Sequence, residues 1–246
     1  MPARYRLIVN ADDFGFNRDV NAGIVEAHRQ GILTATTLMA NGNAFDDAVA
    51  LARENPSLDV GCHLSLVQGC SVVDPSRRLP PTIAAFLRAL IRRELNVYKE
   101  GYAQLSKLHA AGIRPTHIDT HKHTHLLPPV LDAVIKLANE FEIPWIRRRF
   151  ITPSVTNGLR GLKTTDHFIG FLLTGKLNTE NLARTLSKLP EGLTEFMCHP
   201  GKMGPELQAS RTRLKESREI ELAALLSPKV RQAIEQRGIE LVNYRA

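Results

Sequence analysis

The chain of 246 residues is long enough to bury a large core, and its 43% hydrophobic and 23% charged content are ordinary for a globular protein. No apolar run approaches the roughly 18–20 residues that a membrane-spanning helix needs, and the first residues lack an apolar signal region, so we expect a cytoplasmic protein. The formal net charge is +7, but the basic groups are dispersed and lack interleaved aromatic residues, which argues against a nucleic-acid partner.

Short apolar runs alternate with longer amphipathic segments along the chain. The strand-like runs are Leu7–Asn10, Ala35–Met39, Asp59–His63, Thr116–Asp119, Trp145–Arg147, Thr194–Cys198 and Ile239–Val242. We expect helices that follow the cap Asn17, that cover Ala44–Glu54 and Glu216–Leu226, and that begin at Pro128. Such alternation is typical of parallel strands joined by crossover helices. We therefore predict an α/β fold, a (β/α) barrel that is TIM-like and irregular or incomplete, with an open doubly wound sheet as the alternative.

Two stretches interrupt this alternation, Val67–Thr82 and Thr152–Asn178. The first contains three prolines and one glycine, the second contains four glycines and one proline, and both are long enough to cover the mouth of a site. No linker separates them from the rest, so we expect a single domain over residues 1–246. The three cysteines are odd in number and widely spaced, which does not fit a disulfide framework. We expect Cys62 and Cys198 to be buried and to face away from the histidines that follow them.

Two adjacent carboxylates, Asp12 and Asp13, follow the first strand-like run. Neighbouring carboxylates repel each other, so a fold rarely places them at the end of a strand for stability. A divalent cation removes the repulsion and allows one aspartate to bind the ion while the other moves a proton. The other chemical candidates also follow strand-like runs, and the carboxyl ends of parallel strands are where sites of α/β folds assemble.

Histidines in three segments supply further candidate groups. His63 ends a strand-like run, and His199 precedes Pro-Gly, which holds it extended before a sharp turn and suits a general acid. The segment from His117 to His125 carries histidine or aspartate at every odd position. If it were extended, its ends would lie about 26 Å apart, so only one or two of its side chains bind the same ion. The alternative is a histidine-rich surface loop without metal.

One carboxylate and two imidazoles hold a divalent ion and leave positions for water and substrate. With a free carboxylate to take a proton and a histidine to protonate a leaving amine, this set favours hydrolysis of an amide or ester. Two alternatives stay open at this point. One is a metal-dependent phosphoesterase, although two-metal sites of that class use more bridging carboxylates. The other is a non-catalytic protein that binds metal or another ligand.

Four motifs together resemble the YdjC-like carbohydrate deacetylases, a family that includes the chito-oligosaccharide deacetylases. The motifs are Asn10–Gly15, Gly61–Leu66, His117–His125 and His199–Gly201, and they occur in family order. The resemblance covers most of the chain, and the combination is specific although each motif alone is weak. It implies a (β/α) barrel and metal-dependent hydrolysis of an N-acetyl group on an amino sugar.

Carried over by position, the resemblance implies a role for each of several residues. The expected catalytic residues are Asp12 as base and His199 as acid, the expected metal ligands are Asp13, His63 and His125, and the expected substrate contacts are Arg147, His121 and His123. The two aspartates are exchangeable in this scheme, and Arg147 is expected either to contact substrate or to orient a carboxylate. The implied cofactor is one divalent metal ion, zinc or magnesium, because the family description favours magnesium whereas two imidazoles suit zinc.

The opening motif and the short chain resemble most the hopanoid-biosynthesis-associated branch of this family. That branch implies an N-acetylglucosaminyl hopanoid lipid as substrate. The basic surface would then favour a peripheral contact with anionic membrane headgroups. The sequence leaves the oligomeric state open, with a homodimer among the alternatives.

Overall fold

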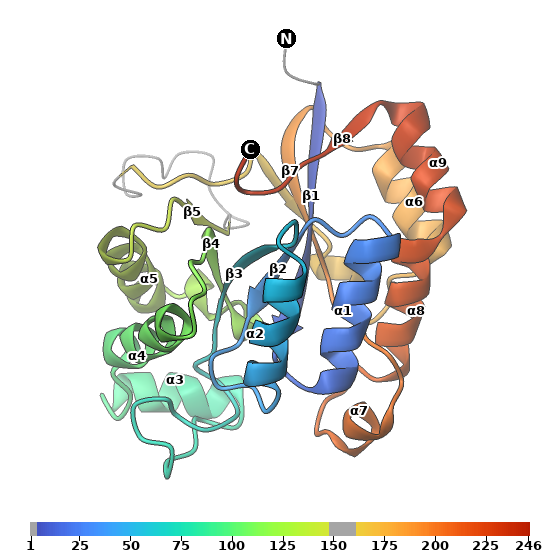
Figure 1. Cartoon of the computed structure of the whole chain (residues 1–246). Helices are drawn as coiled ribbons and strands as arrows, with labels where there is room; N and C mark the ends of the chain where they lie inside the picture. Colours follow the sequence, from blue (N-terminus) through green and yellow to red (C-terminus); the bar gives the residue numbers. More distant parts are fainter. Residues whose placement is uncertain (1–3, 148–160) are drawn as a thin grey trace.

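A computed structural model describes residues 4–147 and 161–246 of the chain. Within these ranges eight strands form one sheet with the order β5-β4-β3-β2-β1-β7-β6, and β8 pairs with β1 (Figure 1). The strands are β1 (Tyr5–Phe14), β2 (Ala35–Leu38), β3 (Asp59–Leu64), β4 (His117–Thr120), β5 (Trp145–Ile146), β6 (His167–Ile169), β7 (Gly192–Cys198) and β8 (Ile239–Leu241). Each pair of neighbouring strands is parallel.

The sheet has edges at β5 and β6 in the described part of the chain, so the fold is a parallel α/β half-barrel, an incomplete TIM-like barrel. This confirms the predicted fold class, and all seven predicted strands are present. The eighth, β6, lies in the stretch 152–178, which interrupts the strand–helix alternation in the sequence and for which no strand was predicted; residues 148–160, which include the start of that stretch, lie outside the described residues. That the chain forms a single domain stays a prediction.

Helices follow most strands and cover the sheet (Figure 1). They are α1 (Arg18–Gln30), α2 (Phe45–Glu54), α3 (Ile83–Ile91), α4 (Val97–Ala110), α5 (Pro128–Glu140), α6 (Thr179–Ser187), α7 (Pro205–Ala209), α8 (Glu216–Leu226) and α9 (Pro228–Arg237). The four predicted helices are confirmed. The side chain of Asn17 accepts from the Val20 N–H at the start of α1, and Pro128 occupies the first turn of α5, where a missing N–H has no consequence. None of the described helices combines the length and the apolar character needed to cross a membrane.

Strand β1 runs through the centre of the sheet and has two different faces. Leu7, Val9 and Ala11 belong to the main hydrophobic core, whereas Ile8 joins a smaller apolar cluster on the other face. Side chains alternate between faces along a strand, so Asn10 and Asp12 follow Ile8 on that second face. The second face therefore changes along β1 from apolar to polar toward its carboxyl end.

The carboxyl ends of the strands lie toward the lower part of the view in Figure 1, where the loops after β1, β3, β4 and β7 meet. Helices α3 and α7 lie at the same end. Cys62 and Cys198 are buried and free, as predicted. The fold thus brings to one place the polar residues that follow separate strands in the sequence.

Candidate metal centre and active site

A bulge near the end of β1 places two consecutive carboxylates in one site. The register of β1 against β2 shifts between Ala11 and Phe14, and Asp13 has a left-handed backbone with φ of 73°. In a regular strand Asp12 and Asp13 would face opposite sides of the sheet. Here each belongs to a cluster of potential metal ligands that includes His63. A left-handed aspartate is uncommon, so the strained turn indicates a local functional demand.

The first cluster joins Asp13 to His63 and His121, whose ligand atoms all lie within 4.8 Å of one another. Asp13 Oδ1 lies 3.4 Å from His63 Nε2 and 3.2 Å from His121 Nδ1. Despite these short distances, the buried Oδ1 accepts no well-aligned hydrogen bond within the described residues. The other oxygen, Oδ2, accepts from Arg218 Nη2 at 2.5 Å. One carboxylate oxygen and two imidazole nitrogens that face one another fit a divalent cation.

The charges of this cluster also favour a cation. Burial alone would raise the pKa of Asp13, but the Arg218 guanidinium and the two imidazoles hold it well below its ordinary value. Burial alone would lower the pKa of His63, but the carboxylates of Asp119 and Asp12 raise it to about 10. A proton on His63 therefore supplies positive charge in a site with an excess of carboxylates. Metal binding must displace that proton, so the affinity depends on pH.

Asp119 orients His63 from the next strand. Its Oδ1 accepts from His63 Nδ1 at 2.6 Å, and its Oδ2 lies 3.2 Å from the Thr37 hydroxyl, which donates to it. With Nδ1 occupied in this way, His63 directs Nε2 toward Asp13. A carboxylate behind a histidine ligand is a common arrangement in metal sites, because it holds the ring orientation and raises its basicity.

The second cluster consists of Asp12, His63 and Asp119, and the buried guanidinium of Arg147 pairs with both of its carboxylates. Arg147 donates from Nη1 to Asp12 Oδ2 at 2.9 Å and from Nη2 to Asp12 Oδ1 at 2.6 Å. Its Nη2 also lies 2.6 Å from Asp119 Oδ2, and its Nε donates to Glu195 Oε1 at 2.7 Å. Burial would raise the pKa of Asp12, but Arg147 outweighs burial and holds the pKa well below its ordinary value. Asp12 is therefore an ionised carboxylate of fixed orientation.

His199 follows the end of β7, the strand that pairs with β1 on the side away from β2. Its backbone N–H donates to Glu221 Oε2 at 2.6 Å, and its Nδ1 has no hydrogen-bond partner within the described residues. Burial lowers the pKa of His199 to about 4, against the carboxylates of Asp12 and Asp13. The free imidazole is therefore neutral at neutral pH.

A cavity of about 720 Å³ opens onto these groups. Asp12, Asp13, His63, His121 and His199 all line it, as do other polar and apolar side chains. The volume suits a ligand of the size of a sugar unit or more. The site thus joins a candidate cation cluster, an ionised carboxylate and a neutral imidazole around one space.

The predicted site residues fall into two sets in the structure. Asp12, Asp13, His63, His121, His123 and His199 line the cavity. Arg147 is buried behind Asp12 and orients it, which is one of the two roles expected of it. His125 is buried and its Nδ1 lies 2.8 Å from the Thr120 hydroxyl; within the described residues the cluster with Asp13 and His63 contains His121 and not His125.

The segment 117–125 is extended only as far as Thr120. Strand β4 ends there and the 3₁₀ turn η1 (His121–Leu126) follows, with left-handed φ values of 56° at Lys122 and 53° at His123. This turn places His121 at the strand's end, T-shaped against His63 with 5.4 Å between ring centroids. His117 lies deeper, stacked on Tyr244, and its Nε2 lies 3.0 Å from Asn10 Oδ1.

The sequence interpretation missed the contribution of α8. Arg218 was counted among the dispersed basic groups of the chain, but it is 1% exposed and pairs with Asp13. Glu221 was not singled out, and it binds the His199 backbone. Both share one helical face with the buried Leu222 and Leu225. The sequence did contain a signal for these two residues, because they occupy positions that the helical periodicity assigns to the buried face of α8.

The half-barrel thus carries a candidate cation cluster, an ionised carboxylate and a neutral imidazole at the carboxyl ends of its strands, where sites of α/β folds assemble. Residues 6–236 match the model of the YdjC-like protein family, and the chain belongs to that family. A carbohydrate deacetylase from Brevibacillus brevis is 35% identical over 250 residues, covering 97% of this chain and 98% of that protein. A chitooligosaccharide deacetylase from Yersinia enterocolitica is 34% identical over 251 residues, covering 97% of each.

A solved structure shows the same architecture. The crystal structure of a protein from Enterococcus faecalis V583 superposes with a TM-score of 0.83 at 29% identity, covering 99% of this chain and 98% of that one. The predicted family and the predicted enzyme class, a hydrolytic deacetylase, are confirmed. Membership of the hopanoid-associated branch stays a prediction.

Proposed function

We propose that this enzyme removes the N-acetyl group from an amino sugar, with one divalent metal ion held by Asp13, His63 and His121. The observation that carries the proposal is the buried Asp13 Oδ1, which faces two imidazole nitrogens at the floor of a cavity. The relatives named as carbohydrate and chitooligosaccharide deacetylases support the choice of substrate.

The geometry favours His121 over His125 as the third ligand. His121 Nδ1 lies 3.2 Å from Asp13 Oδ1 and the residue lines the cavity. His125 has its Nδ1 at hydrogen-bond distance from Thr120 and does not line the cavity described here. We therefore revise the ligand set implied by the family resemblance and keep His123 as a candidate substrate contact.

Asp12 is the proposed proton acceptor. A divalent ion in this site would lower the pKa of water and polarise the amide carbonyl. Arg147 keeps Asp12 ionised and fixes its orientation beside the cavity, so the carboxylate is unprotonated at neutral pH. A carboxylate with a pKa this low is a weak base, which suits a site where the water is already acidified.

His199 is the proposed donor to the leaving amine. It lines the cavity at the end of β7, next to the strand end that carries Asp12, and its Nδ1 has no hydrogen-bond partner within the described residues. Burial keeps the imidazole neutral, so His199 would take up a proton from water in the cavity as negative charge developing nearby raises its pKa, and would then pass that proton to the leaving amine. Glu221 holds the backbone of His199 and thereby its position.

Metal analysis combined with an acetate-release assay tests the proposal. The purified protein is stripped with a chelator, reloaded with zinc or magnesium, and assayed on N-acetylglucosamine oligomers and on an N-acetylglucosaminyl lipid of hopanoid type. We expect activity only in the reloaded protein, and the two substrates to distinguish a soluble sugar from the lipid-linked form that the hopanoid branch implies. Release of phosphate from phosphate esters in place of acetate would refute the deacetylase proposal.

A matched pair of variants tests which histidine is the third metal ligand. His121→Ala should lose stoichiometric metal, whereas His125→Ala should keep it if the variant folds. Asp12→Asn should keep the metal and lose turnover. Loss of metal in His125→Ala with retention in His121→Ala would return the third ligand to the residue implied by the family resemblance.

A further inference from the structure

Helix α3 carries an apolar stripe that faces solvent. Ile83, Leu87 and Ile91 are 39%, 38% and 83% exposed, and they recur every four residues, so they share one side of the helix. On the other side Phe86 and Ala89 are buried in the protein. The helix therefore uses one apolar side to anchor itself and presents a second one outward.

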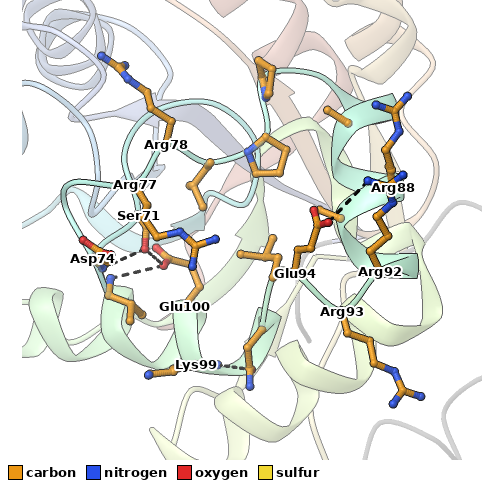
Figure 2. Close-up of a pocket in the computed structure, with 18 residues that line it drawn as sticks. Ser71, Asp74, Arg77, Arg78, Arg88, Arg92, Arg93, Glu94, Lys99 and Glu100 are labelled. Carbon is orange, nitrogen blue, oxygen red and sulfur yellow. Dashed lines mark hydrogen bonds and ion pairs between the residues drawn. The ribbon is translucent and has the colours of Figure 1, made fainter.

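Basic side chains gather beside another side of α3, the side that carries Ala85 and Ala89. A hollow of about 730 Å³ between α3 and the preceding loop is lined by six cationic and three acidic side chains (Figure 2). The cationic residues are Arg77, Arg78, Arg88, Arg92, Arg93 and Lys99, and the acidic residues are Asp74, Glu94 and Glu100. Figure 2 shows Arg88 and Arg92 on the helix at one side of the hollow and Arg77 and Arg78 on the loop at the other.

Most of this positive charge is uncompensated. Of the six cations only Arg92 forms an ion pair within the described part of the chain, with Glu94 at 3.8 Å. Glu100 is buried, and its carboxylate accepts from the Ser71 hydroxyl and the Val72 N–H. With six cationic and three acidic side chains, the hollow therefore presents net positive charge.

We infer that this α3 docking face, the stripe of Ile83, Leu87 and Ile91 with Arg88, Arg92 and Arg93 beside it, binds an anionic lipid surface. An exposed apolar stripe beside arginines is the pattern of a helix that lies in a membrane interface, with aliphatic side chains among the acyl chains and cations at the phosphates. The inference concerns binding and does not depend on the proposed deacetylation.

The charges favour this occupant over a second copy of the chain. A two-fold dimer through the α3 docking face would bring the same set of arginines from both copies together, and like charges across an interface are costly. The aliphatic character of the stripe does not suit nucleic acid, where aromatic residues stack on bases. Figure 1 places α3 at the end of the molecule where the strands' carboxyl ends meet, so docking would hold that end near the lipid surface.

Vesicle flotation with the full-length protein tests the inference. Vesicles of phosphatidylcholine alone are compared with vesicles that also contain phosphatidylglycerol, at low and high salt. We expect binding to the anionic vesicles only, weakened by salt. Arg88→Gln with Arg92→Gln should weaken binding about 25-fold, at about fivefold for each arginine. Leu87→Ser with Ile91→Ser should weaken it further at high salt, where the apolar contact dominates.

Matched controls come from other exposed helices. Arg184→Gln with Lys188→Gln on and just after α6, and Ile220→Ser on α8, remove equivalent groups elsewhere and should leave binding unchanged. Equal binding to both kinds of vesicle, or an equal loss in the controls, would overturn the inference. So would a dimer that Leu87→Ser with Ile91→Ser dissociates in the absence of any vesicle binding. Acetate release from a soluble oligomer, measured on the same variants, should not change, which separates this inference from the proposed function.

Discussion

Asp12 and Asp13 are neighbours in the chain, but the surroundings of their carboxylates differ. Both oxygens of Asp12 accept from Arg147, so its hydrogen-bonding capacity toward the protein is largely used. Asp13 gives only Oδ2 to Arg218 and leaves Oδ1 facing two imidazoles. The same residue type is therefore fixed as an ionised group at one position and kept as a potential ligand at the next.

The difference arises from the backbone and from which helix or strand supplies the arginine. The left-handed Asp13 turns its side chain away from the strand's alternation, toward α8 and the end of β4. Asp12 keeps that alternation and meets Arg147, which follows β5. Burial with complete pairing gives orientation, whereas burial with one atom unpaired gives affinity for a cation. The variants below test this contrast, in order of expected effect.

Removing the Asp13 charge should have the largest effect. Asp13→Asn should release the metal and lower kcat/KM by more than the roughly 10²–10⁴-fold expected from loss of a general base alone. The reason is that both the ion and its activation of water are lost. Metal content and acetate release measure the two effects together.

Asp12→Asn is the matched control for that experiment. It should keep the metal and lower kcat by about 10²–10⁴-fold, in line with the loss of a proton acceptor. If Asp12→Asn instead loses the metal and Asp13→Asn retains it, the roles of the two carboxylates are exchanged.

Arg147→Met should produce the largest loss of stability. The guanidinium pairs with Asp12, Asp119 and Glu195, all buried, and its removal leaves three carboxylates without their counter-charge. We expect the free energy of unfolding to fall by about 3–5 kcal/mol, measured by denaturant titration. Arg184→Met on the exposed face of α6 should change it by about 0.5 kcal/mol or less. A loss below about 1 kcal/mol for Arg147→Met would show that the pairing around Asp12 is not structural.

We expect the stability to depend on pH through Glu221, which lies on the same helix as Arg218, the partner of Asp13. Burial raises its pKa from 4.5 to about 7, so between these values the folded protein holds a proton that the unfolded chain has lost. The contribution of this group is thus fully present below pH 4.5 and is lost as pH rises through 7, by at most about 3 kcal/mol. Glu221→Gln should flatten this part of the pH profile of unfolding, whereas Glu235→Gln on the exposed side of α9 should not. Identical profiles for wild type and Glu221→Gln would contradict the assignment.

The sequence alone predicted those parts of the fold and the site that follow from local pattern. Apolar runs and caps located the seven strands and four helices, and the pair Asp12-Asp13 with His63 marked the site because polar residues after buried strands are rare without a role. Strand β6 was missed because its three residues are only partly buried and lie in a glycine-rich stretch.

What the sequence could not predict depends on tertiary structure. The choice of His121 over His125 in the Asp13 cluster rests on the left-handed turn at Lys122 and His123, which no periodicity signals. The pairing of Arg218 with Asp13 joins residues 205 positions apart, and the packing of α8 against α1, the helix that follows β1, brings them together. Long-range electrostatic pairs of this kind leave no local trace other than a charge at an apolar position.

Asp119 contacts the surroundings of both Asp12 and Asp13. Its substitution should have the smallest effect of the changes proposed for these two surroundings. Its Oδ1 accepts from His63 on the Asp13 side, and its Oδ2 contacts Arg147 on the Asp12 side. Asp119→Asn should weaken metal affinity about 10–100-fold, as expected when the group that orients a histidine ligand is lost. Competition with a chelating dye measures this affinity, and the loss should be graded rather than complete because His63 itself remains.

Asp59→Asn is the control for burial of the changed group. Asp59 begins the same strand as His63 and is equally buried, but its partners are Thr116, Tyr244 and Arg245 at the other end of β3. It should lower stability without changing metal affinity. Unchanged affinity in Asp119→Asn would mean that His63 is held by packing alone, and the link between the two regions would then be structural and would not tune the metal site.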